Sequence, residues 1–118
     1  MINNAKESVI IVTSAEGLAR KADSLKRALK KAKDRKVKIR IAAPLNKQSE
    51  KAAKMLKDVA EVKNINMKGR FCIVDGKEVT FMLMDDANVH PNYDAGVWVQ
   101  TLLFAQALQS MFEMHWNN

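Results

Sequence analysis

The sequence lacks most of the features that stabilise small secreted proteins or anchor proteins in membranes. Its 118 residues include one cysteine, which excludes an internal disulfide framework and a four-cysteine zinc site. No run approaches the roughly 18 to 20 consecutive apolar residues that a membrane span requires. The first seven residues also lack the apolar core of a signal peptide. We therefore expect a cytoplasmic protein with no membrane partner.

What the sequence does contain is enough apolar material for one buried core. Hydrophobic residues make up 47% of the chain, which is ordinary for a globular protein and argues against wholesale disorder. The chain shows no internal repeat, no low-complexity tract and no linker. Residues 1–118 are therefore predicted to form a single domain.

The formal net charge is +7, and it is unevenly distributed along the chain. Residues 20–40 carry eleven Lys or Arg and two acids, whereas residues 69–118 carry two Lys or Arg and six acids. Such a basic stretch is compatible with a nucleic-acid partner, but it is more often the solvated outer face of a helix. The candidate nucleic-acid contacts are Lys26, Arg27, Lys30, Lys31 and Lys33.

The first sixty residues alternate between strand and helix patterns. Residues 9–12 form a β-branched run that is typical of a strand buried on both faces. An amphipathic helical stripe then runs from Leu18 to Ala32. Residues 36–41 alternate as in a strand with one exposed face, and residues 47–60 form a second helical pattern. This order predicts parallel strands joined by right-handed crossovers.

The pattern changes after residue 60. Residues 62–65 are a short strand candidate, and residues 70–74 and 79–84 are apolar runs separated by an Asp-Gly turn. That arrangement is the strongest short-range signal for a β-hairpin. Residues 95–99 predict a further strand, and residues 102–116 a helix. The fold class is therefore α/β, with a mixed, mostly parallel sheet flanked by helices.

The helix predicted over residues 102–116 is apolar on more than one side. Such a helix lies either deep in a core or against a partner chain. In a domain of this size we favour an isologous homodimer, and the alternative is a terminal helix packed only on its own sheet. The candidate interface residues are Phe104, Leu108, Met111, Phe112 and Trp116.

Residues 68–77 read Lys-Gly-Arg-Phe-Cys-Ile-Val-Asp-Gly-Lys. This segment resembles the phospholipase D superfamily signature, His-x-Lys-x4-Asp before an Ile-Val-Asp-Gly turn, and it implies a phospholipase-D-like fold. Aligned on Asp75, the family's lysine falls at Arg70 and its nucleophilic histidine at Lys68. The protonated ammonium of Lys68 has no free lone pair at neutral pH and cannot act as that nucleophile. We therefore expect no enzymatic activity.

A closer resemblance covers residues 70–79, 84–86, 90–94 and 98–99. Together these segments resemble the C-terminal domain of archaeal TrmB-like transcriptional regulators. The resemblance implies a non-catalytic, ligand-sensing and dimerisation domain in which DNA is bound only by a preceding winged-helix domain. The residues before Val9 are too few to encode a winged helix. We therefore expect an excised effector domain or a stand-alone relative.

The resemblance also implies an effector site near Lys68 and Arg70, where the superfamily binds phosphate. An arginine fork suits a phosphate or a carboxylate, so the expected effector is a small or anionic molecule. The alternative is that Arg70 pairs with Asp75, Asp85 or Asp94 as a structural relic. The candidate ligand-binding residues are Lys68, Arg70, Asp75, Asp85, His90 and Asp94.

A metal site is a weaker possibility at Asp85, Asp86, His90 and Asp94, which lie within ten residues of one another. Their spacing matches no metal motif, and a polar loop explains them equally well. We therefore expect no metal and no cofactor. Two other functions stay open. One is a phosphodiesterase or nuclease of the phospholipase D superfamily built across a homodimer, and the other is a basic nucleic-acid-binding domain.

Overall fold

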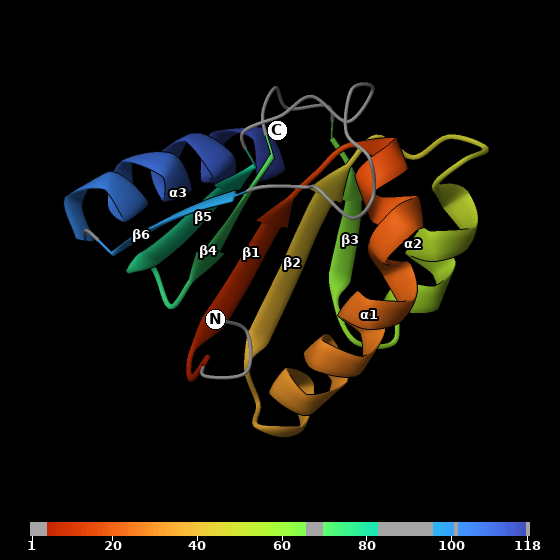
Figure 1. The fold of residues 1–118 in the computed structure, drawn as a ribbon, viewed down its shortest axis with the longest axis horizontal. Helices are drawn as coiled ribbons and strands as arrows, with labels where there is room; N and C mark the ends of the chain where they lie inside the picture. Colours follow the sequence, from red (N-terminus) through yellow and green to blue (C-terminus); the bar gives the residue numbers. More distant parts are fainter. Residues whose placement is uncertain (1–4, 66–69, 83–95, 101, 118) are drawn as a thin grey trace.

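The computed structural model of the chain describes residues 5–65, 70–82, 96–100 and 102–117. They form one six-stranded sheet with helices on both faces (Figure 1). The elements in chain order are β1 (Ser8–Val12), α1 (Ala15–Asp34), β2 (Lys38–Ala43), α2 (Glu50–Leu56), β3 (Glu61–Asn64), β4 (Phe71–Val74), β5 (Glu78–Met82), β6 (Gly96–Gln100) and α3 (Leu102–Trp116).

The strand order across the sheet is β3-β2-β1-β4-β5-β6. The strands β1, β2 and β3 are parallel, because helical crossovers connect them. The strands β4, β5 and β6 continue the sheet with antiparallel pairings, beginning with β4 against β1. The predicted mixed α/β fold is confirmed, but the expectation that the sheet is mostly parallel is wrong, because β4, β5 and β6 all pair antiparallel to their neighbours.

The two faces of the sheet are covered by different helices. Helices α1 and α2 lie on one face, and α3 crosses the other (Figure 1). Strand β1 contributes side chains to the cores on both faces, because alternate side chains of a strand point to opposite faces of the sheet. Val9 and Ile11 enter the core under α1 and α2, and Ile10 and Val12 enter the core under α3. The prediction of a strand buried on both faces is therefore confirmed.

Strand β2 corrects the prediction of a strand with one exposed face. Its residues from Ile39 to Ala43 are all buried, and Arg40 is only 7% exposed. Arg40 points to the α3 face, where its guanidinium pairs with the carboxylate of Glu113. The alternating sequence pattern is real, but the polar position is covered by α3, whose Glu113 lies 73 residues later in the chain.

Helix α1 begins and ends with recognisable caps. The Ser14 hydroxyl accepts a hydrogen bond from the Gly17 N–H at 3.0 Å. At the other end the Val37 N–H donates to the Ala32 carbonyl and the Lys36 N–H to the Lys33 carbonyl, which is the Schellman pattern. Lys36 occupies the left-handed position, with φ of 66°, where glycine is usual.

The hairpin predicted at Asp75-Gly76 is present between β4 and β5. Both residues have positive φ, 56° and 68°, which is the combination that makes Asp-Gly favourable in hairpin turns. A Cβ at Gly76 would also stand 3.2 Å from the Gln109 side chain of α3. The turn therefore needs glycine for its backbone conformation and for its close approach to α3.

Candidate functional site

The carboxyl ends of β1, β2 and β3 meet at one edge of the sheet, which we call the carboxyl edge (top of Figure 1). The antiparallel strands share this edge through the pairings of Val12 with Phe71 and Met82 with Gly96. In open α/β sheets ligands bind outside the carboxyl ends of the parallel strands. The carboxyl edge is therefore the first place to look for a site.

Arg70 lies at the carboxyl edge, immediately before β4. Its side chain is half-buried, and its Nε is shielded from solvent. Arg20, in the second turn of the helix that follows β1, also has a shielded Nε. A guanidinium held partly out of water binds phosphate or carboxylate more strongly than an exposed one. Sequence analysis identified Arg70 and missed Arg20, which stands in a basic run without distinguishing neighbours.

Asp75 lies at the opposite end of β4, a distance of about 16 Å for five residues of extended chain. Its carboxylate accepts hydrogen bonds from the N–H groups of Glu7, at 2.8 Å, and of Lys6 and Ser8, at 3.1 Å. The prediction that Asp75 and Arg70 share a ligand site is therefore wrong. The pairing of Arg70 with Asp75 as a structural relic is excluded by the same distance.

The pKa of Asp75 reflects its structural task. Partial desolvation raises the pKa, but the three backbone hydrogen bonds and the nearby Lys77 ammonium outweigh it, and the pKa lies below its ordinary value. The carboxylate therefore stays ionised and fastens the chain that leads into β1. This role accounts for an aspartate at this place.

Other polar groups at the carboxyl edge are committed to loop structure. The Ser49 hydroxyl donates to the Pro44 carbonyl at 2.7 Å and accepts from the Asn46 N–H at 3.1 Å. The Asn64 side chain accepts from the Leu45 N–H at 3.0 Å. These contacts close the connection from β2 to α2, so the chemistry available at this edge lies on its β1–β4 side.

Four of the predicted ligand-binding residues, Lys68, Asp85, His90 and Asp94, lie outside the described residues. The same holds for Asp86 of the weighed metal site. Their segments, 66–69 and 83–95, are flanked by strand ends at the carboxyl edge. Within the part of the chain that the structure describes, no group of three His, Cys, Asp or Glu side chains could hold a metal ion.

Cys72 in β4 is not a candidate nucleophile. Burial raises the pKa of its thiol to about 12, so the thiol stays protonated at neutral pH. Its side chain packs against the core under α1 and α2. Cys72 is therefore a small apolar packing residue.

The residues predicted for a dimer interface divide between two sides of α3. Phe112 and Trp116 are buried on the sheet of their own chain, and their rings stack at 5.3 Å. Phe104 and Met111 are exposed, and Leu108 is half-buried. The assignment of Phe112 and Trp116 to an intermolecular surface is therefore corrected. The exposed large hydrophobic residues of this helix are Leu102, Leu103, Phe104, Met111 and Met114.

The predicted nucleic-acid contacts lie on the outside of α1. Arg27, Lys30, Lys31 and Lys33 are exposed, and Lys26 is half-buried. Helix α2 lies beside α1 on the same face and adds exposed lysines that sequence analysis did not include (Figure 1). Those residues follow β2 in the sequence, so only the fold shows that they extend the same basic surface. The added lysines are Lys51 and Lys54 of α2, together with Lys47 and Lys57, which flank the helix.

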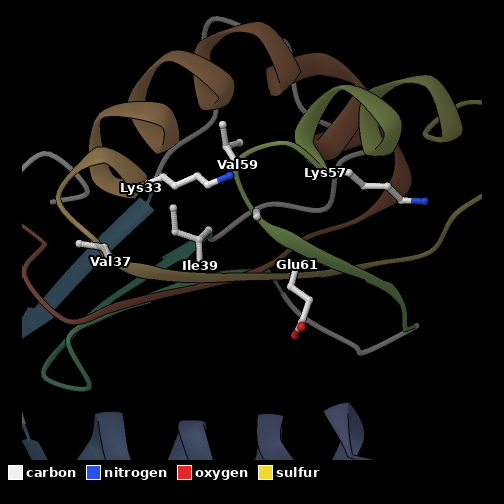
Figure 2. Close-up of a pocket in the computed structure, with 7 residues that line it drawn as sticks. Lys33, Val37, Ile39, Lys57, Val59 and Glu61 are labelled. Carbon is white, nitrogen blue, oxygen red and sulfur yellow. The ribbon is translucent and has the colours of Figure 1, made fainter.

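An open hollow of about 330 Å³ lies between the ends of α1 and α2 (Figure 2). Lys33 of α1 enters it, whereas the side chain of Lys57, directly after α2, lines its rim and points away from it, and Val37, Ile39 and Val59 supply apolar lining. The Lys33 ammonium donates to the Asp58 carbonyl. The hollow lies at the amino ends of β2 and β3, so it is separate from the carboxyl edge. It continues the basic surface of α1 and α2.

Comparison with known proteins gives a consistent picture of the fold. The family model described as cardiolipin synthase, PLD-like domain, matches residues 1–116. NucT from Helicobacter pylori is similar in structure, with a TM-score of 0.72 and 20% identity over 98% of this chain and 82% of NucT. TrmBL2, an archaeal chromatin protein, is similar with a TM-score of 0.67 and 21% identity over 98% of this chain. No curated protein matches the chain.

The chain spans 45% of TrmBL2, whose structure is described as showing a novel mode of DNA binding. Identities of 20% and 21% establish a shared fold and leave the chemistry to be argued from the residues. No helix within the described ranges is long and apolar enough to cross a membrane.

Proposed function

The chain belongs to the family of PLD-like domains, and from this premise we propose that it is a non-catalytic, ligand-sensing and dimerisation domain of a TrmB-type transcription regulator. In this proposal the protein is cytoplasmic, and DNA is bound through a winged-helix domain joined to it. An effector at the carboxyl edge then biases the geometry of the dimer through its different affinity for two states.

The observation that carries this proposal is the pair of replacements in the signature, Lys68 for histidine and Arg70 for lysine. Nucleophilic attack on phosphorus needs a free lone pair, which a protonated ammonium or guanidinium does not have. The chain has two histidines, His90 and His115. His115 is exposed near the end of α3, where a ring nitrogen lies 3.0 Å from the Met111 carbonyl oxygen. Both replacements keep the positive charge that an anion requires.

Arg70 supports the ligand-sensing part of the proposal. It lies at the edge where α/β sheets bind ligands, it is half-buried, and its fork matches a phosphate or carboxylate. Asp75 lies at the other end of β4 and is not part of this edge. The expected effector is therefore an anionic metabolite.

A turnover assay tests the non-catalytic part. The purified chain is incubated with a chromogenic phosphodiester, and separately with plasmid DNA, with and without Mg²⁺. We expect no product above that of a buffer blank. Turnover that is abolished by Lys68→Ala or Arg70→Ala would overturn the proposal and favour a phosphodiesterase built across a homodimer.

A thermal-shift screen tests ligand sensing, with sugars, nucleotides and phosphorylated metabolites as probes. A ligand at 100 times its Kd stabilises the folded state by about 2.7 kcal/mol, which raises Tm by several degrees. We expect a shift with a phosphorylated or carboxylated probe, lost in Arg70→Met and kept in the control Arg27→Met. A shift that survives Arg70→Met would place the ligand elsewhere, and no shift with any probe would contradict ligand sensing.

A further inference from the structure

We propose that the outer face of α1 and α2 itself binds the phosphate backbone of double-stranded nucleic acid, without regard to base sequence. This surface, the basic face, is defined by five exposed residues, Arg27, Lys30, Lys31, Lys51 and Lys54. The inference is independent of the proposed function, which assigns DNA binding to a separate winged-helix domain.

The charge of the molecule is separated by the sheet. Helix α1 carries seven Lys or Arg and three acids, and α2 carries two Lys and one acid. On the other face of the sheet, α3 carries no Lys or Arg and one acid, Glu113. Lys54 lies 3.9 Å from Glu50, a long and exposed ion pair that leaves its ammonium accessible. The excess of positive charge on α1 and α2 attracts a polyanion.

The dimensions of the basic face suit a duplex. Helix α1 has 20 residues and is about 30 Å long, close to the 34 Å of one turn of DNA. Helix α2 has seven residues and is about 10 Å long, so it widens the surface over part of the length of α1, to roughly 20 Å with about 8 to 10 Å between the helix axes. That surface is too wide to enter a major groove of about 12 Å, so it contacts the backbone from outside. Contact with the backbone alone carries no direct sequence information.

The basic face lacks the aromatic and large apolar side chains that other polyanionic partners require. The first 70 residues contain no Phe, Tyr or Trp, so α1 and α2 offer no platform on which single-stranded bases could stack. A helix that binds a membrane surface inserts large apolar side chains. Among the described residues, the exposed large hydrophobic side chains are all on α3, on the opposite face of the sheet. Duplex backbone is the partner that requires only positive charge and length.

Acidic residues on the same helices set the expected strength. Glu16, Asp23 and Asp34 are exposed on α1 and repel phosphates locally. We therefore expect a Kd in the range of non-specific binding, about 10⁻⁴ to 10⁻⁶ M at physiological salt. With about four phosphates neutralised, raising salt from 50 to 200 mM should weaken binding by roughly 100-fold.

Fluorescence anisotropy with two labelled 20-base-pair duplexes of unrelated sequence tests the inference on the 118-residue chain. We expect Kd values within about 3-fold of each other and the salt dependence given above. Lys30→Glu with Lys51→Glu should raise Kd by at least about 10-fold and reduce the salt slope by about 2. Circular dichroism melting confirms that the variants fold.

The matched control is Lys77→Glu, which makes the same charge change as Lys30→Glu but in the turn between β4 and β5, where Lys77 is exposed. We expect Lys30→Glu to weaken binding several-fold more than Lys77→Glu. Equal weakening, absence of duplex binding, tighter binding to single strands, or a strong preference for one duplex sequence would each overturn the inference. So would binding to phosphatidylserine vesicles in preference to the duplex at the same salt concentration.

Discussion

The two faces of the sheet are built alike on the inside and differently on the outside. Under each face the alternating residues of β1 meet a helix with an apolar inner side. Outward, α1 and α2 present lysine and arginine, whereas α3 presents Leu103, which is 80% exposed, and Met114, which is 71% exposed. Packing against the sheet explains the apolar inner sides of the helices but not the residues on their outer sides. The outer sides are therefore the candidate surfaces for binding partners.

The two faces also differ in how the helix is held. The inner side of α1 is apolar, with Leu18, Ala22, Leu29 and Ala32 buried. The inner side of α3 presents Phe112 and Trp116 to the charged side chain of Arg40 in β2. The Cζ atom of Arg40 lies 5.1 Å from the ring centroid of Phe112 and 5.7 Å from that of Trp116. Polar and cation–π contacts have directional requirements that apolar packing lacks, so the position of α3 on the sheet is more narrowly specified.

Lys63 of β3 reinforces the end of α3. Its ammonium donates to the Trp116 carbonyl at 2.8 Å and lies 4.7 Å from the centroid of the Trp116 ring. A lysine that donates to a carbonyl in the last turn of a helix also interacts favourably with the helix dipole. Helix α3 is therefore tied to both β2 and β3 by cationic side chains.

The largest expected effect is the difference in stability loss between substitutions on the inner and outer sides of α3. Phe112→Ala removes a side chain with no exposed surface and should lower the free energy of unfolding by about 3 to 5 kcal/mol. Phe104→Ala, at a residue that is 44% exposed, should cost about 1 kcal/mol or less. Urea unfolding followed by circular dichroism measures both. Equal losses would mean that the inner and outer sides of α3 are wrongly assigned.

The ion pair beneath α3 gives the next effect. Glu113→Ala leaves the Arg40 guanidinium buried without its carboxylate and should cost about 2 kcal/mol, less than for a fully buried pair because the Glu113 side chain is 38% exposed. The double variant Arg40→Met with Glu113→Leu should recover most of this loss. Urea unfolding of the two variants decides the point. A double variant as unstable as the single one would show that the pair is required for packing of α3.

The Asp75 carboxylate holds the segment that leads into β1, the strand that contributes to the cores on both faces of the sheet. Asp75→Ala removes the acceptor of three backbone hydrogen bonds and should cost about 1 to 2 kcal/mol. The folded pKa is lowered, so the stabilisation is present above the unfolded pKa, near 4, and is lost as pH falls through the folded pKa. The difference in Tm between the wild type and Asp75→Ala should therefore narrow as the pH falls from 7 to 3, leaving a pH-independent part because alanine is strained at the positive φ of this position. A constant difference between the two would contradict this assignment.

Lys36 offers a smaller, stabilising change at the end of α1. Its φ of 66° is unfavourable for a side chain with a Cβ, so Lys36→Gly should raise the free energy of unfolding by about 1 kcal/mol. Lys36→Ala removes the same charge without relieving the backbone and should give no gain. Urea unfolding of the two variants therefore distinguishes the effect of the backbone conformation on the free energy of unfolding from the effect of the lost charge.

The smallest effect on folding is expected on the outer side of α3. Met111→Glu should change the unfolding free energy by about 0.5 kcal/mol or less, because Met111 is 42% exposed. In the proposed homodimer the same change should reduce the mass measured by sedimentation from twice 13.3 kDa to one chain. Lys30→Glu on the basic face should leave the dimer intact. A wild-type monomer at high concentration would remove the dimer from the proposed function.

Much of the fold could be predicted because its signals are local. The β-branched run of β1, the apolar stripe of α1 and the Asp-Gly turn each lie within one stretch of sequence. The errors arose where a partner is distant. Arg40 reads as an exposed position because Glu113 lies 73 residues away. The partners of Asp75 are 67 to 69 residues earlier, so a family signature suggested a ligand where the structure has backbone N–H groups.

The site was harder to predict than the fold for a related reason. An apolar pattern shows that Phe112 and Trp116 avoid water, but it does not show whether a sheet or a partner chain covers them. The lysines of α2 are separated from those of α1 by a whole strand, so no window of sequence unites them. Arg70, singled out from its position in the signature, lies directly before β4, and its role as a ligand-binding residue stays a prediction.

The central position of β1 has a consequence for how the chain folds. Its neighbour β2 lies about thirty residues away in sequence, but its other neighbour, β4, pairs Val9 with Val74. The half that carries the basic face can therefore assemble from nearby contacts, whereas the half that carries α3 must close a loop of more than sixty residues. Since non-local pairings slow folding, completion of the sheet by β4 is expected to limit the rate. During synthesis, one edge of β1 stays open until the hairpin of β4 and β5 has emerged.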